Sequence, residues 1–230
     1  MSKKILVIGT NNAYHLYKNI QDHLGDAEVK FVGKKNCPLA TIIQNIRTTE
    51  FQPTEVVIQV GDDEFAAEVR YTTRNEKKVI HLLNYVAKNQ DEINQNYTNL
   101  EELTTLYQCR IWILDSFPRF PIKCCNLHRT APFNRYNQDY EEHQNNYRIF
   151  WQTPRENRTF IPLHTLINYE EWSLNLPETK ASLLYDGIHL RTQTIHMITL
   201  RLIHMMYPEL EVYWRNHNDD DMYEQFLLAN

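Results

Sequence analysis

The stretch Lys4-Ile5-Leu6-Val7-Ile8-Gly9-Thr10-Asn11, residues 4–11, joins an unbroken apolar run to a glycine and two polar residues. A short apolar run that ends at a glycine is typical of a buried β-strand. The residues that follow predict a helix over 11–24, with Asn11 or Asn12 as its N-cap. Its apolar positions recur at helical spacing: Ala13, Leu16, Tyr17, Ile20 and Leu24. The stretch therefore predicts a strand, a turn and a helix.

This unit repeats along the chain. The pattern predicts further strands over 28–32, 56–60, 109–114 and 159–162, and helices over 39–46, 133–150 and 192–206. We expect long polar helices over 74–106, and a loop over 115–121 because its two prolines exclude a helix or a central strand. The alternation predicts a flavodoxin-like fold, a doubly wound parallel five-stranded sheet in a three-layer α/β/α arrangement. We expect one domain over 1–206 and an acidic C-terminal tail over 207–230.

Length and composition limit the class of protein. With 230 residues, 42% of them apolar, the chain can bury the core of one domain. Its net charge of -5 excludes an overall basic nucleic-acid binder but not a local basic face. No apolar run is long enough to span a bilayer, and the scattered cysteines do not form the framework of a small secreted domain. We expect a soluble intracellular protein, in the cytoplasm rather than the nucleus and without membrane contact.

Several predicted strands end in polar or small residues that should meet at one edge of the sheet. They are Gly9-Thr10-Asn11, Gly33, Gly61-Asp62-Asp63 and Asp115-Ser116. Near the C-terminus, Asp186 precedes His189 by three residues, with a glycine between them. Such an Asp can accept a hydrogen bond from the Nδ1–H of the His and leave Nε2 free, as in a hydrolytic triad. The same sequence pattern also arises when an ordinary Asp-Gly turn happens to lie beside a His.

Together these segments resemble the SGNH (GDSL) hydrolase family, over residues 4–206. The resemblance implies esterase, lipase or deacetylase chemistry on a flavodoxin-like fold. In that family the first strand ends in Gly-Asp-Ser, whose serine is the nucleophile, and an Asp-x-x-His block completes the triad. Asp186 and His189 match that block, but Asn11 occupies the serine position and Thr10 the preceding Asp position. An amide is not a nucleophile, so the resemblance implies a member that has lost its serine chemistry.

The positions that would stabilise an oxyanion are altered as well. In the family, a glycine after the second strand and the Asn of a Gly-x-Asn-Asp block donate to the oxyanion. Here Gly33 follows the second strand, Cys37-Pro38 stands where the family block aligns best, and Asp63 replaces the Asn. A carboxylate repels an oxyanion, and proline has no N–H to donate.

Two alternative interpretations retain a chemical function for these residues. Thr10 could act as an unorthodox nucleophile in an active esterase or deacetylase, which would need a shift of register. Asp62, Asp63, Asp186 and His189 could gather a divalent metal, but the family resemblance already accounts for Asp186 and His189. We therefore expect no metal and no cofactor.

A region rich in cations and aromatic residues suggests a ligand for an inactive member. The cations proposed to contact nucleic acid are Arg119, Lys123, Arg129, Arg135, Arg155 and Arg158, interleaved with aromatic residues from Phe117 to Trp151. Phosphate contacts combined with base stacking suit single-stranded RNA. In its lost serine the chain is similar to the RNA-binding C-terminal domain of the insect protein Oskar. Alternatively, the arginines are solvated or paired with Glu141, Glu142 and Glu156. We predict a binding module for RNA or a protein partner, with no prediction of oligomeric state.

Overall fold

A computed structural model describes residues 3–34, 37–61, 68–74, 77–84, 89–119, 131–170, 173–174, 176–185 and 189–210. Its centre is a five-stranded parallel sheet in the order β2-β1-β3-β6-β7. The strands are β1 (Lys4–Gly9), β2 (Glu28–Gly33), β3 (Glu55–Gln59), β6 (Arg110–Leu114) and β7 (Arg158–Ile161). Taken in chain order, this is the flavodoxin-like order 2-1-3-4-5. The predicted fold class is confirmed.

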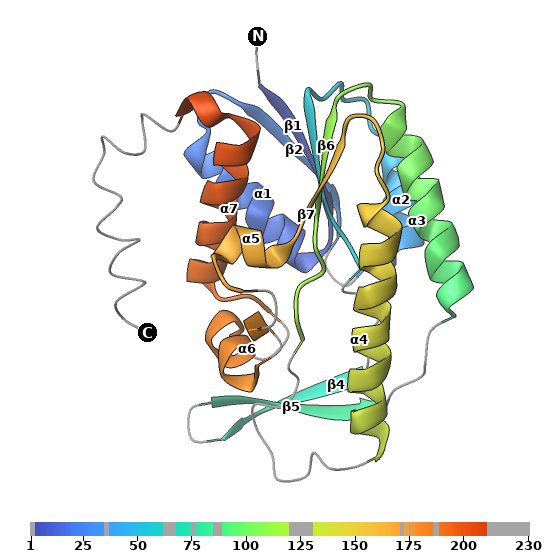
Figure 1. Cartoon of the computed structure of the whole chain (residues 1–230), viewed down its shortest axis with the longest axis vertical. Helices are drawn as coiled ribbons and strands as arrows, with labels where there is room; N and C mark the ends of the chain where they lie inside the picture. The colour runs from blue at the N-terminus through green and yellow to red at the C-terminus, as the bar shows by residue number, and fades with distance from the viewer. Residues whose placement is uncertain are drawn as a thin grey trace.

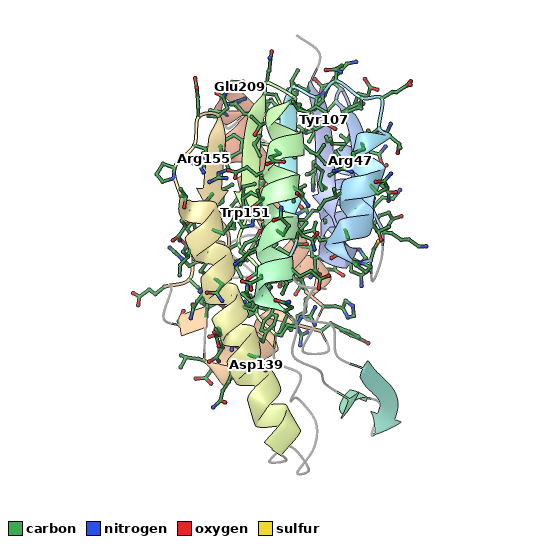
Figure 2. All side chains as sticks on the ribbon, turned by 90° about the vertical axis from the view of Figure 1, so that its right-hand side faces the viewer. Arg47, Tyr107, Asp139, Trp151, Arg155 and Glu209 are labelled. Carbon is green, nitrogen blue, oxygen red and sulfur yellow. The ribbon has the colours of Figure 1, made fainter. Side chains whose placement is uncertain are left out.

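Helices cover both faces of the sheet (Figure 1). One face is covered by α1 (Asn11–His23), α5 (Leu163–Ile167) and α7 (Thr192–Met206), and the other by α2 (Leu39–Arg47), α3 (Gln90–Thr105) and α4 (Ala131–Gln152). Figure 2 views the second face, with α3 and α4 in front. Ile5 and Val7 of β1 pack on the first face, whereas Leu6 and Ile8 pack on the second. The strand is apolar throughout because successive side chains enter two buried layers.

The expected long helices over 74–106 are wrong in their first part. Instead, β4 (Glu68–Arg74) and β5 (Lys77–Asn84) pair as a separate two-stranded antiparallel sheet. The segment of β4 is rich in β-branched and aromatic residues, and β5 carries the β-branched pair Val79-Ile80, which favours a strand over a helix. The helix α3 begins only at Gln90, where the side chain of Asn89 accepts a hydrogen bond from the backbone N–H of Asp91 at 3.0 Å.

The other expected strands and helices are present, with ends that differ by a few residues. Two short helices, α5 and α6 (Pro177–Leu183), were not predicted, because segments of this length carry little periodic signal. After α7, Tyr207 is buried and Pro208–Leu210 form the 3-10 turn η3. Residues 211–230 lie outside the described residues, so the division into a domain and an acidic tail stays a prediction.

Candidate functional site

The ends of β1 and β2 are held together by two glycines. A Cβ atom on Gly33 would lie 1.8 Å from the carbonyl oxygen of Gly9 and 2.7 Å from the ring of Phe31. A Cβ atom on Gly9 would lie 2.0 Å from the carbonyl oxygen of Gln59. Only glycine fits at either position. Gly33, predicted as an oxyanion remnant, is therefore required by strand packing whether or not it ever faces a substrate.

Asn11, which the sequence resemblance aligns with a serine nucleophile, is the first residue of α1 and follows β1 after Thr10. It is 9% exposed, and Thr10 is 1% exposed. The expected N-cap at Asn11 or Asn12 is wrong: Thr10 takes that position, without a side-chain capping bond, and Asn11 and Asn12 lie inside the helix. The carbonyl oxygen of Thr10 accepts a hydrogen bond from the backbone N–H of Tyr14 at 3.0 Å, which closes the first turn of α1. The strand passes into the helix with no intervening loop.

His189 lies shortly before α7, next to an isolated β-bridge. Leu184 and Leu190 form this antiparallel bridge, and the backbone N–H of Tyr185 donates to the carbonyl oxygen of His189 at 2.8 Å. Both leucines belong to the buried cluster that includes Ala13 of α1. The bridge is therefore anchored against the same core as the start of α1. Asp186 lies outside the described residues, so its hydrogen bond to His189 stays a prediction.

The end of β3 is fixed by contacts with helices α3 and α4. Gly61 has a φ of +97°, and a Cβ atom there would lie 2.9 Å from the ring of Tyr147. The Nε2–H of His143 donates to the carbonyl oxygen of Gly61 at 2.8 Å. Burial and the nearby charge of Arg119 lower the pKa of His143 to about 4, so its ring is neutral at pH 7. Asp62 and Asp63 come next in the chain and lie outside the described residues.

The loop after β6 is held by polar side chains of α4. Tyr147 donates through its hydroxyl to the carbonyl oxygen of Leu114 at 2.8 Å, and Tyr140 to that of Phe117 at 2.6 Å. Gln144 donates to the same Phe117 carbonyl oxygen at 3.2 Å. These hydrogen bonds provide donors for buried backbone carbonyl oxygens, in a segment that pairs with no strand over part of its length. The sequence predicted the loop but gave no signal for the side chains that hold it.

Asp115 forms a buried ion pair beneath this loop. The Nε–H of Arg148 donates to both carboxylate oxygens, at 3.0 and 3.1 Å, and the side chain of Asp115 is 3% exposed. Burial raises the pKa of Asp115, although Arg148 and the N–H of Leu163 oppose the rise. Ser116 is 1% exposed, and its hydroxyl has no hydrogen-bond partner among the described residues. The pair joins β6 to α4 and to the start of α5.

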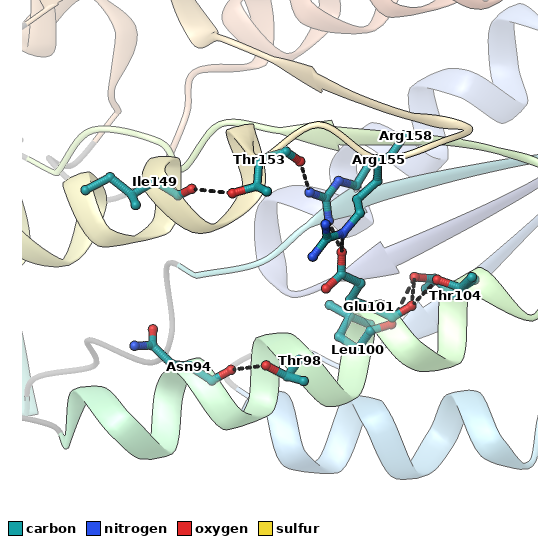
Figure 3. Close-up of polar contacts among 10 residues, drawn as sticks. Asn94, Thr98, Leu100, Glu101, Thr104, Ile149, Thr153, Arg155 and Arg158 are labelled. Atoms are coloured by element: carbon teal, nitrogen blue, oxygen red, sulfur yellow. Dashed lines mark hydrogen bonds and ion pairs between the residues drawn. The ribbon is translucent and has the colours of Figure 1, made fainter.

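The arginines assigned to nucleic acid are in part internal. Arg119 is 8% exposed, with its guanidinium 5.3 Å from the centre of the Tyr140 ring. Arg158 and Arg155 both contact the carboxylate of Glu101, Arg155 at 3.2 Å (Figure 3). The side chain of Arg158 is 5% exposed and lies over the ring of Trp151. Among the described side chains, Arg155 and Arg158 pair with Glu101 and Arg148 pairs with Asp115, whereas pairing of the other arginines with Glu141, Glu142 or Glu156 stays a prediction. The side chains of Lys123, Arg129 and Arg135 lie outside the described residues.

Two further observations concern ions and membranes. Within the described ranges, no group of three or more His, Cys, Asp or Glu side chains could hold a metal ion. In the same part of the chain, no helix combines the length and apolar character that crossing a membrane requires.

Solved structures share this fold. A GDSL-like lipase from Bacteroides thetaiotaomicron matches with a TM-score of 0.57 and 13% identity, over 87% of this chain and 86% of the lipase. A candidate SGNH hydrolase from Slackia heliotrinireducens matches with a TM-score of 0.54 and 14% identity, over 90% and 100% of the two chains. An acetyl xylan esterase matches with a TM-score of 0.57 and 14% identity, over 86% and 97%.

Comparison by sequence finds no relative. No protein-family model matches it, and no curated protein matches it. At identities of 13–14% the structural likeness defines the fold alone. The chain has the fold of the SGNH, or GDSL, hydrolases.

Proposed function

We propose that the chain is an SGNH-fold protein without serine hydrolase activity, which acts as a binding module for RNA or a protein partner. The observation that carries the proposal is Asn11, which begins α1 directly at the end of β1, where the resemblance puts the nucleophile. A carboxamide cannot attack an ester carbonyl group. Asp63 at an oxyanion position adds a charge that opposes acyl transfer.

The serines of the described chain and Thr10 offer no ready replacement. Ser116 is buried after β6, and the hydroxyls of Ser173 and Ser182 donate to nearby backbone carbonyl oxygens, of Glu170 at 2.7 Å and Thr179 at 2.8 Å. Thr10 is 1% exposed. An active esterase would have to expose Thr10 or Ser116 before either could react, so that alternative has the weaker support.

Restoring the family residues should restore some activity. We expect the double variant Asn11→Ser with Asp63→Asn to hydrolyse p-nitrophenyl acetate with a burst at least about tenfold above the wild-type rate, because a single oxyanion donor is already worth about 10²-fold or more. The matched control keeps Asp63→Asn but moves the serine by one residue, as Asn12→Ser, and its hydrolysis should stay at background. Adding His189→Ala to the first variant should remove the burst. A burst equal in the Asn11 and Asn12 variants would contradict the assignment of the nucleophile position.

The nucleic-acid part of the proposal rests on Lys123, Arg129 and Arg135, since Arg119 and Arg158 are buried and Arg155 is paired. We expect micromolar binding of single-stranded RNA that weakens with salt, because a chain of net charge -5 attracts a polyanion only through a local face. Replacing all three cations by Glu should abolish binding in fluorescence anisotropy. Arg47→Glu, the same charge change at the exposed end of α2, is the control for Arg129→Glu. Equal losses from these single variants would argue for diffuse attraction only.

A further inference from the structure

Three aromatic rings form a continuous group where α1 meets the edge strand β2. Tyr14 and Tyr17 come from α1 and Phe31 from β2, and we call these residues the aromatic ledge. The ring centres of Tyr14 and Phe31 are 5.5 Å apart, those of Tyr17 and Phe31 are 5.7 Å apart, and those of Tyr14 and Tyr17 are 6.0 Å apart. Tyr17 and Phe31 also pack against the buried core, which fixes the inner side of the ledge.

Tyr14 gives the ledge an exposed ring. It is 41% exposed, yet it contacts both fixed rings edge-on or tilted. A ring held on one side and open on the other presents a flat apolar face to a ligand with little loss of side-chain entropy. The ledge also reaches the carboxyl ends of the strands, since the ring of Phe31 fills the space left by the missing side chain of Gly33. It therefore borders the edge of the sheet where α1 begins.

A lysine of α1 lies against the rings of the ledge. The Nζ of Lys18 lies 5.4 Å from the centre of the Tyr17 ring and 5.9 Å from that of Tyr14. Lys34 is exposed and directly follows Gly33 at the end of β2. From Asn11 to Gln21 the helix carries no acidic residue, and its first one is Asp22. A ligand that stacks on Tyr14 would therefore meet the ammonium group of Lys18, which lies over the tyrosine rings, and no carboxylate of α1 until the last turn.

We infer that the aromatic ledge is a stacking site for single-stranded nucleic acid, with a base on Tyr14 and the backbone phosphate near Lys18. Exposed aromatic rings with adjacent cations are the elements that hold unstacked bases, and every base offers a π-face. The inference rests on the nucleic-acid part of the proposed function but uses another surface. The ledge lies on the α1 face of the sheet, whereas α4, which contains Arg135, lies on the opposite face (Figure 1).

The test measures fluorescence anisotropy with a labelled twelve-residue oligouridine at two salt concentrations. We expect Tyr14→Ala to weaken binding about tenfold, within the range for one lost stacking contact, and Tyr14→Phe to keep the wild-type affinity. Lys18→Ala should reduce the salt dependence by about one phosphate contact. The control is Ile149→Ala on α4. Ile149 is 69% exposed, and its replacement should leave binding unchanged.

The outcomes separate the two proposals. If the wild-type chain binds the oligouridine and Tyr14→Ala binds equally well, the ledge is not the stacking site, and the nucleic-acid function stands on other residues. If the wild-type chain binds no single strand at low salt, both are overturned, and a protein partner becomes the better account. Equal weakening by Tyr14→Ala and Ile149→Ala would also contradict the inference, because it would reflect a loss of folding rather than of stacking.

Discussion

Replacing Arg148 by methionine should lower the free energy of unfolding by about 3 kcal/mol, because it leaves the Asp115 carboxylate buried without its partner. The side chain of Asp115 is 3% exposed, so water cannot take over the role of the guanidinium. The backbone N–H groups of Leu163 and Ser116 also act on that carboxylate, but the bond from Leu163 is long at 3.4 Å and neither group carries a charge. The measurement is urea unfolding at pH 7, followed by tryptophan fluorescence.

The control for this variant is Arg155→Met, which removes an ion pair of the same kind from a more exposed site. The Arg155 side chain is 58% exposed and shares Glu101 with Arg158, so we expect a loss below about 1 kcal/mol. The double variant Asp115→Asn with Arg148→Met should be more stable than Arg148→Met alone, since it removes the unpaired charge. Equal losses from Arg148→Met and Arg155→Met would show that the Asp115 pair does not hold the β6 loop.

Acid should destabilise the protein through His143. Its pKa is about 4 in the folded chain and 6.5 in the unfolded chain. Between these two pH values the ring is protonated in the unfolded chain and neutral in the folded chain. The neutral ring therefore contributes stability that is fully present above pH 6.5 and is lost as the pH falls toward 4. The difference between the two pKa values corresponds to a loss of at most about 3 kcal/mol in the free energy of unfolding. Asp115, whose pKa is raised by burial, works in the opposite direction at low pH.

The variant His143→Gln isolates this contribution, because an amide can still donate to the carbonyl oxygen of Gly61 but does not titrate between pH 7 and 4. We expect the free energy of unfolding of the wild type to fall more steeply than that of the variant over this range. The contribution of Asp115 is common to both proteins and cancels in the difference. Parallel curves for the two proteins would mean that His143 is not buried in a neutral state.

The sequence predicted the central sheet because its strands enter two buried layers and are apolar throughout. Residues 4–9 and 56–60 show this pattern, and α7 was predicted with its observed ends because its apolar residues recur at helical spacing over four turns. The antiparallel pair of β4 and β5 was missed because its polar residues resemble those of an exposed helix. Propensity alone separates the two, and it is the weaker signal.

The candidate site was predictable only where chain order decides it. Asn11 follows the first strand, so its place at the start of α1 could be expected from local sequence. The bonds from α4 to Gly61, Leu114 and Phe117 join residues far apart in the sequence, as do those from Glu101 to Arg155 and Arg158. No periodic pattern reports such pairs. The assignment of Arg119 and Arg158 to nucleic acid shows the difficulty, since composition does not separate a buried arginine from a solvated one.

The most direct test of the central claim is labelling of the wild-type chain with a fluorescent fluorophosphonate, which reacts covalently with activated serine and threonine hydroxyls. The double variant Asn11→Ser with Asp63→Asn serves as the positive control, and a heat-denatured sample gives the background. Because the resemblance to the SGNH hydrolases puts Asn11 where a serine nucleophile would stand, we predict that the wild type labels no more than the denatured sample. Labelling above that background, mapped by mass spectrometry to Thr10 or Ser116, would contradict the account and establish an active hydrolase with an unorthodox nucleophile.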